Sequence, residues 1–206
     1  MPAVRPIVVF DLGGVLIDWD PRYLYRKIFG ADEAGMEHFL ATVCTAAWNL
    51  RQDAGRSLAE ASSELKAEHP AVAGLIDLWA ERWPEMIAGE IPATVAVLEE
   101  LHARGTPLYA LTNWSAETFP HARARFAFLA RFRGILVSGE EGMVKPDPRI
   151  YRRLFERFAI APERAVFIDD NAANVAAAGA LGLHAHRFTG APGLRAALGE
   201  LGLLER

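Results

Sequence analysis

The feature that most constrains the fold is the regular alternation of short apolar segments with helical patterns along a chain of 206 residues. Strand-like segments occupy residues 7–10, 107–111, 134–137 and 165–168, with a weaker one at 184–188. Helical patterns occupy residues 92–103, 148–158 and 172–181. Strands that are joined through helices form right-handed crossovers, so the alternation predicts an α/β fold with a Rossmann-like parallel sheet covered by helices.

Residues 18–88 interrupt this alternation, because they contain helical patterns but no convincing strand. They follow directly after the first strand of the expected sheet. We therefore expect an α/β core made of residues 1–17 and 89–206, with residues 18–88 inserted as a small helical domain.

Two of the expected strands end in carboxylates. The first runs into Asp11, which Leu12 and then two glycines follow, and the strand at 165–168 is followed by Asp169 and Asp170. In an open parallel sheet, both strand ends meet at the carboxyl edge, which is where such sheets place their sites. Three carboxylates that meet repel one another unless a cation lies between them, and oxygen ligands suit Mg²⁺.

Composition excludes several other classes of protein. The formal net charge of −4 argues against a nucleic-acid-binding or anionic-membrane surface. One cysteine, Cys44, excludes an internal disulfide framework and is typical of a reducing compartment. No apolar run is long enough to cross a bilayer. We expect a cytoplasmic protein that is a monomer or a weak homodimer.

Four short motifs occur in an order that identifies a family. They are Asp11, then Thr112-Asn113 after a strand, then Lys145, then Asp169-Asp170. Each motif alone is weak, but their conjunction is specific. The chain resembles the haloacid dehalogenase-like (HAD) hydrolases over essentially its whole length. Its Asp-Leu-Gly first motif and helical insert resemble a small-cap phosphatase subgroup that includes bacterial sugar-phosphate phosphatases.

The resemblance implies Mg²⁺-dependent hydrolysis of small phosphorylated metabolites. Asp11 would be the nucleophile that forms an aspartyl-phosphate, and also a metal ligand. Asp170 would be a second direct ligand, with Asp169 in support. The backbone carbonyl of Gly13 would coordinate the same ion.

The same resemblance implies how the phosphoryl group is held. Lys145 would neutralise the phosphoryl oxygens and steady Asp11. The Thr112 hydroxyl and the Asn113 amide would donate hydrogen bonds to the transferring group. The partner would be a small phosphorylated molecule, with no nucleic acid and no membrane.

One position departs from the family pattern. HAD phosphatases commonly carry a second Asp two residues after the nucleophile, as general acid and base, and here that position is Gly13. The loss removes a proton donor worth roughly 10²–10⁴-fold in rate. It opens an alternative, a metal-independent 2-haloacid dehalogenase that uses Asp11 to displace halide. A phospho-ligand binder that has lost turnover is a third possibility.

Several other residues have two readings each. Asn174 either orients Asp170 or faces solvent. The segment 48–56 has the composition of a loop that selects substrate, through Asn49, Asp53, Arg51, Arg56 and Trp48. Alternatively, it is an ordinary solvated helix junction, with Trp48 buried in the core of the small helical domain. Trp19 and Trp114 either wall a pocket or are buried.

Overall fold

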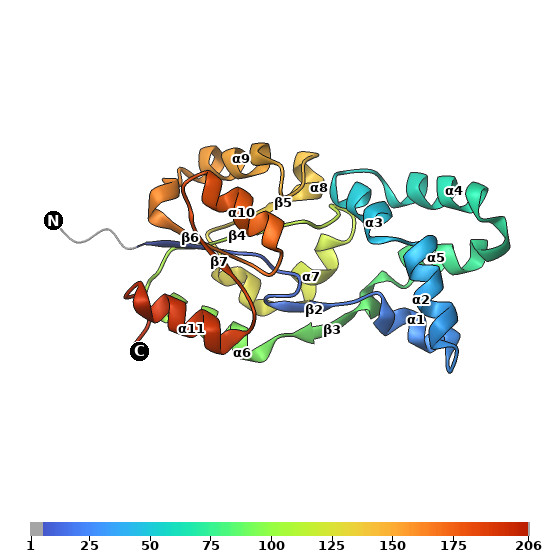
Figure 1. Cartoon of the computed structure of the whole chain (residues 1–206), viewed down its shortest axis with the longest axis horizontal. Coiled ribbons are helices and arrows are strands. Elements are labelled where there is room, and N and C mark those ends of the chain that lie inside the picture. Colours follow the sequence, from blue (N-terminus) through green and yellow to red (C-terminus); the bar gives the residue numbers. More distant parts are fainter. Residues whose placement is uncertain (1–5, 206) are drawn as a thin grey trace.

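The computed structural model describes residues 6–205 and contains a five-stranded, all-parallel sheet in the order β5-β4-β1-β6-β7 (Figure 1). The strands are β1 (Ile7–Phe10), β4 (Leu108–Thr112), β5 (Gly134–Val137), β6 (Ala165–Asp169) and β7 (His184–Arg187). Each strand expected from the sequence is present, and the predicted α/β fold class is confirmed.

Helices cover both faces of this sheet. They are α9 (Pro148–Phe158) and α10 (Ala172–Ala180) on one face, and α6 (Pro92–Ala103) and α11 (Ala191–Glu200) on the other (Figure 1). Side chains of β1 alternate between the faces: Val9 packs with α9 and α10, whereas Val8 and Phe10 pack with α6 and α11. All three are fully buried, which is why the strand has a continuous apolar sequence.

A second, mostly helical lobe lies beside the sheet, at the right of Figure 1. Its helices are α1 (Arg22–Phe29), α2 (Glu33–Thr42), α3 (Ala46–Asp53), α4 (Leu58–Glu68) and α5 (Ala73–Glu81). It is joined to the sheet lobe by an antiparallel ribbon of β2 (Ile17–Trp19) and β3 (Ile87–Glu90). The remaining helices among residues 6–205 are α7 (Phe119–Arg125), α8 (Ser138–Glu141) and four short 3₁₀ turns.

The expectation that residues 18–88 hold no strand is wrong, because parts of β2 and of β3 lie there. These strands have three and four residues, too few to show an alternation of apolar and polar positions. The boundaries expected at 17/18 and 88/89 cut through the ribbon, and the division into core and cap stays a prediction. No helix in the described part of the chain is long and apolar enough to cross a membrane.

The expectation of a loop at 48–56 is also wrong, because residues up to Asp53 belong to α3. The Thr45 hydroxyl accepts a hydrogen bond from the Trp48 backbone N–H at 3.0 Å and so caps this helix. The loop that follows α3 is short and ends at Ser57, whose capping box with Glu60 starts the next helix.

Candidate active site

The three predicted carboxylates converge at the carboxyl edge of the sheet. β1 and β6 are neighbours in register, with Phe10 beside Ile168, so Asp11 and Asp169 follow at the same level. Asp11, Asp169 and Asp170 each offer an oxygen atom, and these three atoms lie within 4.8 Å of one another. The convergence expected from the strand ends is therefore present.

The glycines after Asp11 let the chain turn close to these acids. The Leu12 backbone N–H donates to Asp11 Oδ1 at 2.7 Å, which orients the carboxylate. Gly14 has φ 71°, and a Cβ atom there would lie 2.6 Å from Asp170 Oδ2. Only glycine fits this position without displacing Asp170. A Cβ at Gly13, in contrast, would meet nothing within 4 Å.

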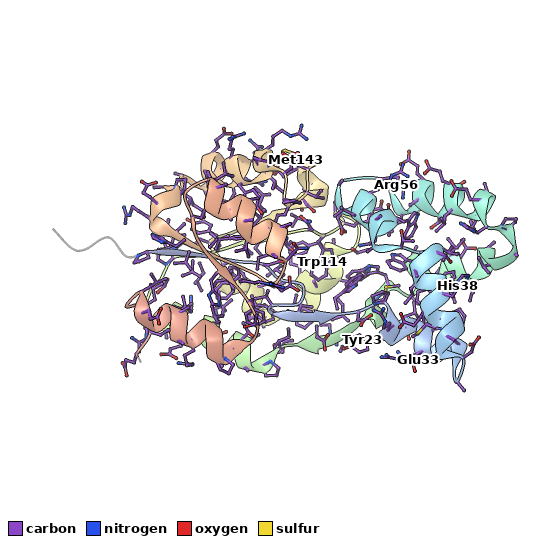
Figure 2. The ribbon with its side chains drawn as sticks, in the orientation of Figure 1. Tyr23, Glu33, His38, Arg56, Trp114 and Met143 are labelled. Atoms are coloured by element: carbon purple, nitrogen blue, oxygen red, sulfur yellow. The ribbon has the colours of Figure 1, made fainter. Side chains whose placement is uncertain are left out.

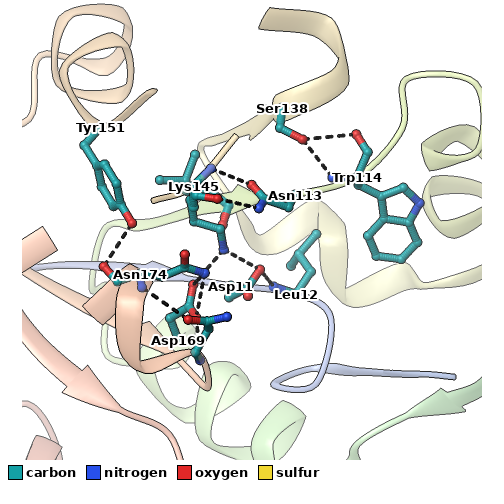
Figure 3. Close-up of polar contacts among 11 residues, drawn as sticks. Asp11, Leu12, Asn113, Trp114, Ser138, Lys145, Tyr151, Asp169 and Asn174 are labelled. Carbon is teal, nitrogen blue, oxygen red and sulfur yellow. Dashed lines mark hydrogen bonds and ion pairs between the residues drawn. The ribbon is translucent and has the colours of Figure 1, made fainter. Parts of the chain in front are cut away.

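Lys145 lies at the centre of the cluster with its side chain 1% exposed. Its Nζ contacts Asp11 Oδ1 at 2.9 Å, and donates to Asp169 Oδ2 at 2.7 Å and to the Leu111 carbonyl at 2.9 Å (Figure 3). Burial acts to lower the pKa of this ammonium group, but the two carboxylates outweigh burial and raise it. Lys145 is therefore a fixed positive charge in the site.

Asn174 has neither of the roles considered for it. It is buried, and its Nδ2 donates to Asp169 Oδ1 and Oδ2, each at 3.1 Å, so it orients Asp169 rather than Asp170. Tyr151, which the sequence analysis did not consider, donates its hydroxyl to the Asn174 carbonyl at 2.9 Å (Figure 3). A chain of contacts thus holds Asp169 from α9 through α10.

Thr112 is the last residue of β4, and Asn113 follows it at the same edge of the sheet. The Asn113 side chain accepts from the Lys145 N–H at 2.8 Å and donates to the Lys145 carbonyl at 3.0 Å, which fixes the loop carrying the lysine. The Thr112 hydroxyl oxygen is buried without a hydrogen-bond partner among the described residues. Such a group is costly unless a ligand or water satisfies it.

The electrostatics of the cluster fit a divalent cation. Burial, followed by the charge of Asp169, raises the pKa of Asp11 from 3.8 to about 7, against the lowering effect of Lys145. Burial and the charge of Asp169 also raise the pKa of Asp170. One lysine does not balance three carboxylates, and oxygen ligands at this spacing are the donor set that Mg²⁺ prefers.

A cavity of about 70 Å³ lies between the acidic cluster and the helical lobe. Its lining residues are Gly13, Trp19, Asn49, Asp53, Leu58, Trp83, Asn113, Trp114, Ser115 and Thr118. Trp114 lies at the junction of the two lobes (Figure 2). Trp19 and Trp114 therefore wall the cavity, and Trp114 is also buried, so both readings of that residue hold.

In the 48–56 segment, Trp48, Arg51 and Arg56 make contacts within the helical lobe and do not line the cavity. Trp48 is buried and packs edge-on against Trp79, with ring centroids 5.2 Å apart. Arg56 donates to Gln52 Oε1 and to Glu64 Oε2, and Arg51 approaches the same glutamate. Asn49 and Asp53 are the members of this segment that line the cavity in the described structure.

Ser138 is a second residue that the sequence analysis did not consider. Its hydroxyl donates to the Asp53 carbonyl at 2.6 Å and accepts from the Trp114 N–H at 2.9 Å. It follows directly after β5, so the strand-end rule used for the acids also points to it. It attaches the end of α3 to the sheet lobe.

A family model described as haloacid dehalogenase-like hydrolase matches residues 6–182. The chain therefore belongs to the haloacid dehalogenase-like hydrolases, as the motif order predicts. It is 28% identical over 197 residues to acyl-CoA dehydrogenase family member 10 of Mus musculus, covering 86% of this chain but only 17% of that protein. It is 25% identical over 179 residues to a phosphorylated carbohydrates phosphatase of Thermotoga maritima, covering 85% of this chain and 81% of that protein.

Solved structures with this fold include an enzyme bound to magnesium and inorganic phosphate and a dehalogenase. A HAD family enzyme of Bacteroides thetaiotaomicron in complex with magnesium and inorganic phosphate has a TM-score of 0.67 and 23% identity, covering 89% of this chain and 94% of that chain. The L-2-haloacid dehalogenase of Xanthobacter autotrophicus has a TM-score of 0.65 and 16% identity, covering 96% and 83%. At these identities the likeness concerns the fold alone, so the site must distinguish the reactions.

Proposed function

We propose that the protein is a Mg²⁺-dependent phosphatase of small phosphorylated metabolites, with sugar phosphates as the expected class. The observation that carries this proposal is the meeting of three carboxylates within 4.8 Å around one buried lysine. A bound Mg²⁺ would cancel the repulsion between these carboxylates and a phosphate dianion.

In this proposal Asp11 attacks phosphorus and becomes an aspartyl-phosphate, which water then hydrolyses. Asp11 and Asp170 hold the metal together with the Gly13 carbonyl, and Asp169 supports it. Lys145 lies 2.9 Å from Asp11 Oδ1, where it can neutralise the phosphoryl oxygens as they approach. The unpaired Thr112 hydroxyl and the Asn113 amide donate to the phosphoryl group.

The helical lobe is proposed as a cap that selects the substrate. Its residues Asn49 and Asp53 line the cavity opposite Gly13 and Asn113. The cavity has a volume of about 70 Å³ between the two lobes, which favours a small molecule over a protein as partner. The relative from Thermotoga maritima, a phosphatase of phosphorylated carbohydrates by its name, supports the same substrate class.

A 2-haloacid dehalogenase is the second candidate, because Gly13 supplies no acid and a halide leaves without protonation. Against it stands the pair Asp169 and Asp170. These two acids repel the nucleophilic carboxylate of Asp11, and a reaction that needs no metal has no use for them.

The experiment that tests the proposal assays one preparation for both reactions. A panel of sugar phosphates and an aryl phosphate is followed by phosphate release, and 2-chloropropionate by chloride release. We expect phosphate release that stops with EDTA and returns with Mg²⁺, and no chloride above background. Full phosphate release in EDTA, or chloride release in place of phosphate, would contradict the proposal.

A further inference from the structure

The proposed phosphatase lacks a proton donor at the usual place. When the bond between phosphorus and an alkyl ester oxygen breaks, the departing alkoxide needs a proton, and Gly13 has no side chain to give one. The space beside Gly13 is open, since a Cβ atom there would meet nothing within 4 Å. A donor that reaches this space from another element would fill the missing role.

Asp53, at the end of α3, faces this space from the helical lobe. It lines the same cavity as Gly13 and Asn113. Among the lining residues in the described part of the chain, Asp53 carries the only ionisable carboxyl group. The acid of this cavity and the glycine at the position where the family carries an acid therefore line the same space.

Several contacts hold Asp53 in place against the sheet lobe. Asn49 Nδ2 donates to Asp53 Oδ2 at 3.1 Å, which leaves Oδ1 free of that contact. The Asp53 carbonyl accepts from Ser138 Oγ at 2.6 Å. Two residues later, Gly55 has φ 101° and passes so close to the Gly139 carbonyl that a Cβ would lie 3.3 Å from it. The carboxyl group is thus fixed where the two lobes meet.

We propose that Asp53 is the general acid and base of this enzyme, supplied by the helical lobe in place of a side chain at Gly13. This inference rests on the proposed phosphatase function. In the first step an Asp11 oxygen bonds to phosphorus, the ester P–O bond breaks, and the departing oxygen takes the proton of Asp53. In the second step the Asp53 carboxylate takes a proton from water as the water oxygen bonds to phosphorus. The P–O bond to Asp11 then breaks, which releases inorganic phosphate and leaves Asp11 as a carboxylate and Asp53 protonated for the next cycle.

The charge state of Asp53 suits this role. Burial raises its pKa from 3.8 to about 7, while the Ser115 backbone N–H and the charge of Lys145 act to lower it. Lys145 is the charged group that acts on it from the sheet lobe, and its close partners Asn49 and Ser138 are neutral. A carboxyl group that titrates near neutral pH can both give and take a proton, which contributes roughly 10²–10⁴-fold in rate.

The test compares Asp53→Asn with wild type on three esters that differ in leaving group: 4-nitrophenyl phosphate, phenyl phosphate and an alkyl phosphate. If Asp53 protonates the leaving oxygen, kcat should fall about 100-fold or more for the alkyl ester and less than about 10-fold for the nitrophenyl ester. We expect the wild-type kcat for the alkyl ester to fall at high pH, where Asp53 is deprotonated, and we expect this fall to disappear in the variant. The control is Asp77→Asn, which removes an acid of the helical lobe that pairs with Lys66 at its surface and should change neither rate.

The two aryl esters carry no hydroxyl groups, so a role of Asp53 in binding sugar hydroxyls would not affect them. Equal losses on all three esters, or no loss, would overturn the proposal. The double variant Gly13→Asp/Asp53→Asn provides a second test, because an acid at the open position should raise the kcat for the alkyl ester at least 10-fold above that of Asp53→Asn. No restoration in a folded double variant would also count against it. A wild type that releases no phosphate from any ester would instead refute the phosphatase function itself.

Discussion

Replacing Lys145 by Met tests whether one buried cation holds the acidic cluster together. The substitution keeps most of the side-chain volume and removes the charge that contacts Asp11 at 2.9 Å and Asp169 at 2.7 Å. Both carboxylates then lie buried with no cation beside them, since Asp11 is 11% and Asp169 is 0% exposed at the side chain.

The expected loss of unfolding free energy follows from this burial. Breaking a buried ion pair by removing one partner costs about 3–5 kcal/mol. The Leu111 carbonyl also loses its donor at 2.9 Å, which adds about 1–3 kcal/mol if no water replaces it. Protonation of the carboxylates limits the total, so we expect about 3–5 kcal/mol at pH 8.

The loss should depend on pH in a defined direction. The pKa of Asp11 is already raised from 3.8 to about 7, and removal of Lys145 raises it further. Between pH 3.8 and the raised pKa, the native state binds more protons than the unfolded state, so the free energy of unfolding falls as pH rises. The variant should therefore lose least near pH 4 and most at pH 8.

Urea unfolding at pH 5 and pH 8, with EDTA and with Mg²⁺, measures these differences. Lys27→Met is the matched control, because Lys27 is 55% exposed and pairs with Glu85 at the surface. That pair is worth about 0–1 kcal/mol. Mg²⁺ should recover part of the stability lost at pH 8, because it binds the folded carboxylates. A loss at Lys145 no larger than the control, or one independent of pH, would refute the reasoning.

Three further predictions concern the same cluster. Gly14→Ala should weaken Mg²⁺ binding measured by calorimetry, because its Cβ would lie 2.6 Å from Asp170 Oδ2; unchanged affinity would show that Asp170 is not needed in that position. Asn174→Ala should lower Mg²⁺ affinity by about 10–100-fold, since Asp169 loses the donor at 3.1 Å that orients it; an equal affinity would argue against this support. Wild type in EDTA should lose about 3 kcal/mol of unfolding free energy between pH 4 and pH 7 through Asp11. Mg²⁺ or Asp11→Asn should flatten that slope, and a slope that neither changes would place the titration elsewhere.

The part of the site that depends on strand ends could be predicted from the sequence. Asp11 and Asp169 each follow an apolar strand, and parallel register then brings them together without further information. The ribbon of β2 and β3 could not be predicted, because segments of three and four residues are defined by each other rather than by their own pattern.

The roles of Asn174 and Asp53 depend on geometry that local sequence does not express. Asn171 caps α10 by accepting from the Ala173 N–H at 2.9 Å, and this sets the rotation that turns Asn174 back toward Asp169. Asp53 reaches the cavity because of the way α3 docks on the sheet lobe through Ser138. That contact joins residues 85 positions apart in the chain.

The measurement that tests the central claim most directly is the trapping of a phosphoenzyme. The enzyme is mixed with Mg²⁺ and a phosphate ester that it hydrolyses, and the reaction is quenched in acid within the first turnover. The peptides of the quenched enzyme are then mapped by mass spectrometry. We predict one added phosphoryl group on the peptide that contains Asp11, absent with EDTA and absent in Asp11→Asn. Phosphate release at an undiminished rate by Asp11→Asn, or an adduct on any other peptide, would contradict the account.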